Sequence, residues 1–190
     1  MNQKGLEDVD WSALPAPMDD GSTNHLNGMS MPNLALPSTC GGNVNLRNLR
    51  GWSVLYFYPM TGRLNRPLPD GWNDIPGARG CTPQSCAFRD LSQELAEKGV
   101  TDIFGISTQS TEYQREAADR LLLPFALLSD AELRLTTALR LPTMEVESML
   151  LIRRLTLVLH DTQVRRVFFP VFPPDRNAAD VLRFMESTQQ

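Results

Sequence analysis

The chain has 190 residues and a formal net charge of −4. That length suits one domain with a full hydrophobic core and a short appendage. The mildly acidic balance gives no reason to expect nucleic acid or an anionic membrane as a partner. No apolar run approaches the roughly 20 residues of a membrane span, and the polar start predicts no secretory signal. We therefore expect a cytoplasmic protein, a compartment in which thiols stay reduced.

The first 30 residues are polar and rich in turn-forming residue types. We interpret residues 1–30 as an irregular N-terminal extension and residues 31–190 as one folded domain. Apolar and polar residues alternate over residues 32–49 on both sides of the segment STCGGN, which predicts a hairpin. Residues 53–59, SVLYFYP, form a continuous apolar run, as a buried central strand does.

A long loop rich in proline and glycine follows, over residues 60–79. Loops of this length inside a compact domain are usually functional. A helix is then predicted with Thr82 as its N-cap and Pro83 at its first position, and Gly99 ends it.

The rest of the chain alternates strands with helices and ends in a hairpin and a helix. Strands are predicted at 101–108 and 125–130, helices at 110–122 and 131–140, a hairpin at 148–172 turning at Asp161 and Thr162, and a last helix at 175–188 capped by Asp175. This order predicts an α/β fold with a mixed central β-sheet flanked by helices. Such sheets place their sites at the carboxyl ends of strands, where the long loop lies.

Two of the three cysteines, Cys81 and Cys86, are separated by four residues around the predicted helix start. Cys81 stands just before the helix, where unpaired N–H groups and the helix dipole favour the nucleophilic thiolate. Cys86 lies five residues on, which in a helix means a rise of about 7.5 Å and about 140° beyond a full turn. Because a disulfide needs closer Cα atoms, we predict that the helix unwinds when the pair is oxidised. Cys81 is then the attacking thiol and Cys86 the resolving thiol.

The segments YFYP and GCTPQSCAFRD, with LALPST before them and RLTLVL after, resemble the Q-type peroxiredoxins. These proteins, also called bacterioferritin comigratory proteins, belong to the alkyl hydroperoxide reductase and thiol-specific antioxidant superfamily. The resemblance covers about residues 31–188. It implies a thioredoxin-like fold and reduction of hydrogen peroxide or organic hydroperoxides without a cofactor. Thioredoxin or a similar dithiol protein would regenerate the enzyme, a monomer or weak homodimer.

The resemblance also implies roles for individual residues. Cys81 matches the peroxidatic cysteine, which is oxidised to sulfenic acid, and Cys86 matches the resolving cysteine. Arg154 falls on the family's arginine in an R-x-T-x-x-I/V pattern, and Gln84 stands where relatives carry Glu or Gln. A guanidinium there would stabilise the thiolate and orient the peroxide. Its neighbour Arg153 points to the other face of a strand, so only one of the two can serve.

One position departs from the family pattern. The threonine expected three residues before the peroxidatic cysteine is Ala78, and Asp74 stands where a proline is expected. Residues 60–79 look like an insertion in the active-site loop, in which Trp72 either lines a substrate mouth or anchors the loop. Thr61 supplies the missing hydroxyl if the loop returns to Cys81; otherwise catalysis proceeds without it, slower or retuned.

Other interpretations stay open. The same residues fit a thiol–disulfide oxidoreductase or redox sensor, and a non-catalytic interaction domain is a further alternative. Cys40, in the predicted turn, is either an incidental thiol or an alternative resolving partner. His25 and His160 lie far from the cysteines and in no ligand spacing, so we expect no metal.

Overall fold

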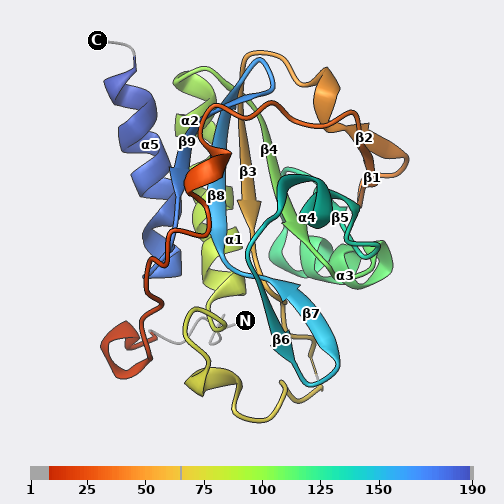
Figure 1. Cartoon of the computed structure of the whole chain (residues 1–190), viewed down its shortest axis with the longest axis vertical. Coiled ribbons are helices and arrows are strands. Elements are labelled where there is room, and N and C mark those ends of the chain that lie inside the picture. Colours follow the sequence, from red (N-terminus) through yellow and green to blue (C-terminus); the bar gives the residue numbers. More distant parts are fainter. Residues whose placement is uncertain (1–8, 65, 189–190) are drawn as a thin grey trace.

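A five-stranded sheet forms the centre of the computed structural model, which describes residues 9–64 and 66–188 (Figure 1). In sheet order the strands are β5 (Leu127–Ser129), β4 (Val100–Ser107), β3 (Trp52–Phe57), β8 (Leu155–His160) and β9 (Gln163–Phe168). β3, β4 and β5 are parallel, whereas β8 is antiparallel to β3 and β9. This mixed sheet confirms the predicted fold class.

Helices and a small hairpin cover the two faces of the sheet (Figure 1). The helices are α1 (Cys81–Asp90), α2 (Ser92–Glu97), α3 (Thr111–Leu121), α4 (Arg134–Leu139) and α5 (Asn177–Ser187). The buried side chains of α1, α2, α3 and α5 pack in one cluster, and those of α4 in another. The hairpin of β1 (Ala35–Pro37) and β2 (Asn43–Asn45), expected from STCGGN, joins the α4 side.

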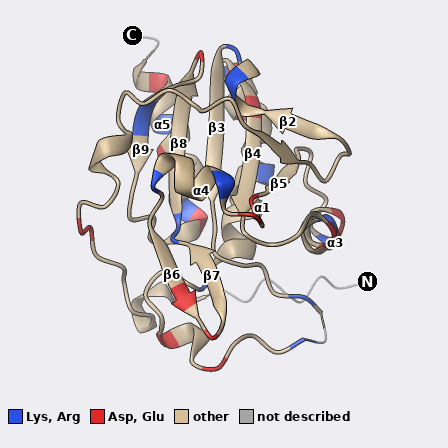
Figure 2. Ribbon diagram, turned by 45° about the vertical axis from the view of Figure 1, so that its right-hand side comes forward, with Lys and Arg blue, Asp and Glu red and all other residues tan. Residues whose placement is uncertain are grey.

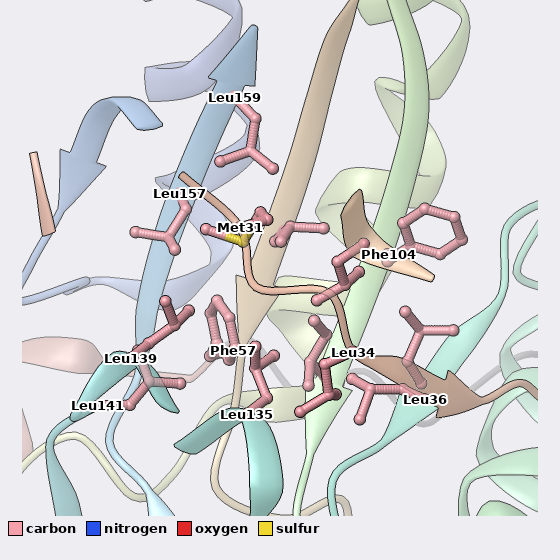
Figure 3. Packing of buried hydrophobic residues seen from close by; sticks show 14 of the residues in the cluster. Met31, Leu34, Leu36, Phe57, Phe104, Leu135, Leu139, Leu141, Leu157 and Leu159 are labelled. Carbon is pink, nitrogen blue, oxygen red and sulfur yellow. The ribbon is translucent and has the colours of Figure 1, made fainter. Parts of the chain in front are cut away.

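Strand β3 explains why the core divides in this way. Successive side chains of a strand point to opposite faces, so Val54 and Tyr56 join the cluster under α1 and α5, while Leu55 and Phe57 join the other. All four side chains are fully buried. Figure 3 shows the second cluster, in which Met31 and Leu34 of the N-terminal region pack against leucines of β8 and α4. The continuous apolar run at 53–59 is therefore the central strand that the sequence predicts.

The region before β1 contributes to this core. Leu26, in a short 3-10 helix over Asn24–Leu26, has no exposed surface, and Ser30 pairs with Gln163 of β9. A further 3-10 helix covers Trp11–Ala13. Packing against the core thus begins before residue 31, while the division of the chain at residue 30 stays a prediction.

The helix after the long loop differs from the prediction in two ways. It begins at Cys81, with Gly80 in a left-handed conformation as the N-cap, so the assignment of Thr82 is wrong. Gln84 N–H already donates to the Gly80 carbonyl at 3.0 Å, which closes the first helical turn two residues earlier than predicted. The helix also breaks at Leu91, where the Ser92 hydroxyl donates to the Arg89 carbonyl, a bond that disturbs helices.

The end of the chain brings a second correction. Asp175 was expected to cap the last helix, but it lies in a 3-10 turn over Pro174–Arg176, and α5 begins at Asn177. Its carboxylate accepts a hydrogen bond from the Trp11 indole at 2.9 Å instead. A distant aromatic donor has replaced the local backbone as partner.

One hairpin was not predicted: β6 (Thr143–Val146) pairs with β7 (Met149–Ile152). It was missed because β7 and β8 read as one continuous strand in the sequence. Residues of the long loop pack on this hairpin in a third apolar cluster, whose buried members are Met60, Trp72, Ala78, Val146 and Leu151. Both the loop and the hairpin lie at one end of the molecule (Figure 1). Among the described residues, no helix is long and apolar enough to cross a membrane.

Candidate active site

Cys81 occupies the first position of α1, after the loop that follows the carboxyl end of β3. Its side chain is 3% exposed and belongs to the cluster under α1 and α5. The thiol borders a pocket of about 490 Å³. Cys81 is therefore packed against the core on one side and borders a cavity on the other.

Arg154 lies beside this thiol. It is 3% exposed and stands between β7 and β8, with Nη2 3.2 Å from the Cys81 Sγ. The same nitrogen donates to the carbonyls of Ala78 at 3.1 Å and Arg79 at 3.2 Å. These partners are uncharged, so the guanidinium keeps its full charge close to the sulfur. A fixed, buried positive charge at this distance stabilises negative charge that develops beside it during a reaction.

A chain of buried amides holds the guanidinium in place. Arg154 Nη1 donates to Oε1 of Gln84, and Nε2 of Gln84 donates to Oδ1 of Asn177 at 2.9 Å. The Thr156 hydroxyl donates to the same Asn177 oxygen at 2.6 Å. Because Asn177 offers only an acceptor here, the Gln84 amide must turn its oxygen towards Arg154. α5 and β8 together therefore set the orientation of the arginine.

Asn177 did not emerge from the sequence. It stands 93 positions from Gln84, and a single asparagine at a helix start carries no pattern that points to a site. Thr156 falls within the RLTLV segment, so a sequence motif already indicated that it lies near the site. No motif indicated its hydrogen-bond partner, Asn177. The sequence thus identified Gln84 and Arg154, which contact each other, but not Asn177, which orients Gln84.

Cys86 is held in the same helix and is not bonded to Cys81. All three cysteines are free, and Cys86 is 5% exposed. Helix geometry places Cα atoms five residues apart at about 8.7 Å, beyond the reach of a disulfide. Burial raises the pKa of the Cys86 thiol, so it stays protonated while the helix is intact. Between the two cysteines, the Tyr56 hydroxyl donates to Ser85 at 3.1 Å and ties the helix to β3.

The Thr61 hydroxyl contacts Gln109 and not the Cys81 sulfur. Its hydroxyl donates to Oε1 of Gln109 at 3.2 Å, and its backbone N–H donates to the same oxygen at 3.0 Å. The hydrogen bonds that the described residues offer Cys81 Sγ are with Arg154 and, at 3.7 Å, the Ala78 carbonyl. The structure does not bring the Thr61 hydroxyl to the thiol, and its role in catalysis stays a prediction.

The remaining candidate residues, Arg153 and Cys40, do not contact the Cys81 sulfur in the described structure. Arg153 turns away from the site and pairs with Asp20 at 2.5 Å. Cys40 is exposed in the turn between β1 and β2. Within residues 9–64 and 66–188, no three His, Cys, Asp or Glu side chains come together as metal ligands would.

Gly80 is required by the local geometry. Its φ is +111°, and a Cβ there would stand 2.4 Å from Pro174 and 3.0 Å from the Trp11 ring. We expect Gly80→Ala to lower the free energy of unfolding by about 2–5 kcal/mol, because it combines backbone strain with overpacking. Denaturant titration measures this loss.

Gly41 provides the matched control, since its φ is +93° but a Cβ there would meet nothing within 4 Å. Gly41→Ala should cost only about 1–2 kcal/mol of strain. Equal losses for the two variants would contradict the tight packing of Pro174 and Trp11 on the helix start.

The fold and the site define a class: a thioredoxin-like α/β protein with a free, buried thiol at a helix start, facing a buried arginine. The family model described as Redoxin matches residues 26–182. The chain belongs to the Redoxin family, and within it to the Q-type peroxiredoxins.

Individual relatives agree with this placement. Peroxiredoxin Bcp of Escherichia coli strain K12 is 39% identical over 102 residues, which cover 53% of this chain and 55% of the relative. Peroxiredoxin Q, chloroplastic, of Suaeda salsa is 29% identical over 161 residues, 84% of this chain and 67% of the relative. The match with the bacterial protein thus spans only about half of its length.

Solved structures share the fold. Peroxidoxin BcpB from Mycobacterium tuberculosis superposes with a TM-score of 0.69 at 27% identity, over 86% of this chain and 98% of that one. Peroxiredoxin Q from Xanthomonas campestris superposes with a TM-score of 0.66 at 22% identity, over 93% and 99% of the two chains. These likenesses confirm the thioredoxin-like fold that the sequence predicted.

Proposed function

We propose that the protein is a thiol-dependent peroxidase that reduces hydrogen peroxide or organic hydroperoxides. The observation that carries this proposal is the 3.2 Å contact between Arg154 Nη2 and Cys81 Sγ, in a thiol that opens onto a cavity. A binding module has no need for a buried guanidinium against a thiol. Membership of the Q-type peroxiredoxins supports the same activity.

In the first step the Cys81 thiolate attacks one oxygen of the peroxide. The S–O bond forms as the O–O bond breaks, so Cys81 becomes a sulfenic acid and the other oxygen leaves as water or an alcohol after taking up a proton. The Arg154 guanidinium stabilises the thiolate before attack and the negative charge on the leaving oxygen during it. Its fixed position avoids reorganisation at the moment of reaction.

In the second step Cys86 attacks the sulfenic sulfur. An S–S bond forms, water leaves, and a dithiol protein such as thioredoxin later reduces the disulfide. The first turns of α1 must unwind for the sulfurs to meet. This breaks the Gln84–Asn177 and Tyr56–Ser85 hydrogen bonds and exposes Cys86 to water, where its thiolate forms more readily.

We expect one equivalent of peroxide to lower the free thiols of the reduced protein from three to one. Cys86→Ser should consume one equivalent and then stop, because its sulfenic acid has no resolving partner. Cys40→Ser is the matched control and should turn over as the wild type does. A wild type that keeps all three thiols would refute the mechanism, and loss of turnover in Cys40→Ser would assign resolution to Cys40.

We also infer the wider setting of this activity. A peroxidase that cycles through free thiols needs a reducing compartment, which favours the cytoplasm, and we expect a monomer or weak homodimer. The alternative is a thiol–disulfide oxidoreductase or redox sensor on the same fold. Fast disulfide exchange with protein dithiols, together with slow reaction with peroxide, would favour that alternative.

A further inference from the structure

The pocket above Cys81 is positively charged in a protein of net charge −4. Its volume is about 490 Å³, and among residues 9–64 and 66–188 four arginines but no aspartate or glutamate line it: Arg63, Arg66, Arg79 and Arg120. Elsewhere acidic and basic residues are interspersed over the ribbon (Figure 2). A cavity lined by one sign of charge concentrates ligands of the opposite sign.

Three of these arginines have defined surroundings. Arg120 pairs with Glu116 at 2.7 Å and also donates to the Gly62 carbonyl, so its charge is partly neutralised and its position fixed. Arg63 lies 3.9 Å from the centre of the Tyr113 ring, and its Nε is buried without a hydrogen-bond partner. Arg79 donates to the neutral amide of Asn73 at 3.1 Å.

The loop 60–79 supplies most of this lining. Arg63, Arg66 and Arg79 all belong to it, and only Arg120, on α3, does not. The segment that departs from the family pattern thus surrounds the thiol with positive charge.

Apolar side chains of the same loop complete the cavity. Met60, Leu68 and Trp72 line it together with Pro83 of α1. Leu68 remains 40% exposed, although large apolar side chains are usually buried. A volume of about 490 Å³ falls in the range of small-molecule sites and far exceeds the size of hydrogen peroxide.

We propose that this pocket selects organic hydroperoxides that carry a carboxylate, with the apolar body against Met60, Leu68 and Trp72. The carboxylate binds Arg63 and Arg66 while the hydroperoxide group reaches Cys81. Arginine suits this role because its guanidinium binds carboxylates through two hydrogen bonds. The inference rests on the proposed peroxidase function, and the chemical step is the one given above.

Cumene hydroperoxide, its 4-carboxylate derivative and the methyl ester of that derivative form a matched set of probes. We expect kcat/KM of the full-length protein to be about tenfold higher or more for the carboxylate than for the ester, and the preference to shrink as salt is added. Arg63→Gln combined with Arg66→Gln should reduce this ratio towards one. Arg165→Gln, on the exposed face of β9, is the control and should leave the ratio unchanged.

Binding of 4-isopropylbenzoate, which lacks the hydroperoxide group, tests carboxylate recognition by the pocket independently of turnover. Titration calorimetry should detect its binding to the wild type and Arg165→Gln, and a loss of about tenfold or more in affinity in the double variant. Equal kcat/KM for carboxylate and ester, or unchanged binding in the double variant, would overturn the inference. Absence of turnover with all three hydroperoxides, despite binding of the benzoate, would instead remove the proposed function.

Discussion

Replacing Cys81 by serine is expected to abolish both peroxide consumption and the loss of thiols on adding peroxide. A serine hydroxyl is a weak nucleophile at neutral pH without an adjacent general base. The described hydrogen-bond partners of the Cys81 sulfur are the Arg154 guanidinium, which cannot accept a proton, and the Ala78 carbonyl. Neither of these partners can activate a hydroxyl, so the loss should be complete within detection.

Serine keeps the shape of the site, which makes this substitution a clean test. The side chains are similar in size, and a hydroxyl oxygen still accepts a hydrogen bond from Arg154. Thermal unfolding of Cys81→Ser should therefore resemble that of the wild type. Peroxide consumption, measured with Cys40→Ser as control, then reports the loss of the thiol and not a loss of stability. A Cys81→Ser protein that still consumes peroxide would assign the nucleophile to another cysteine.

The second large effect is expected at Arg154. Arg154→Gln should lower kcat/KM for peroxide by about 10²–10³, the loss typical of removing one donor to the developing charge. The substitution removes the charge 3.2 Å from the sulfur, so the negative charge that develops in the transition state loses its stabilising partner. The rate of alkylation of Cys81 as a function of pH measures the change in its reactivity without peroxide.

Structural damage must be separated from this electrostatic effect. Arg154→Gln removes the guanidinium donor from the Ala78 and Arg79 carbonyls, which costs about 1–3 kcal/mol of stability. A merely structural role would leave the pH profile of alkylation where it is. Arg154→Lys keeps the charge and should restore part of that profile, although it loses the planar fork.

Arg153→Gln is the matched control for this experiment, since Arg153 is adjacent in the chain but pairs with Asp20 at the surface. We expect its kcat/KM to stay within about twofold of the wild type, because exposed ion pairs contribute little. An equal loss in Arg153→Gln and Arg154→Gln would contradict the assignment of the buried arginine to the site.

Local patterns were enough to identify the elements that carry the chemistry. The apolar run at 53–59 predicted β3 because a strand buried on both faces must be apolar throughout. The hairpins around Cys40 and around Asp161 followed from turn residues between alternating segments. The error at the start of α5 arose where a distant partner outweighed the local capping signal, because Trp11 binds the carboxylate of Asp175.

For the site too, some features follow from the sequence and others only from the tertiary structure. The sequence by itself determined the candidate nucleophile, its helix and the candidate arginine, because each lies within a short motif whose chemistry depends on neighbouring positions. Only the tertiary structure decided that Arg154 rather than Arg153 turns to Cys81, that Asn177 orients Gln84, and that a second hairpin supports the long loop. It alone showed that four arginines line the pocket that Cys81 borders. These contacts join residues far apart in the chain, and the packing of helices and loops on the sheet brings them together.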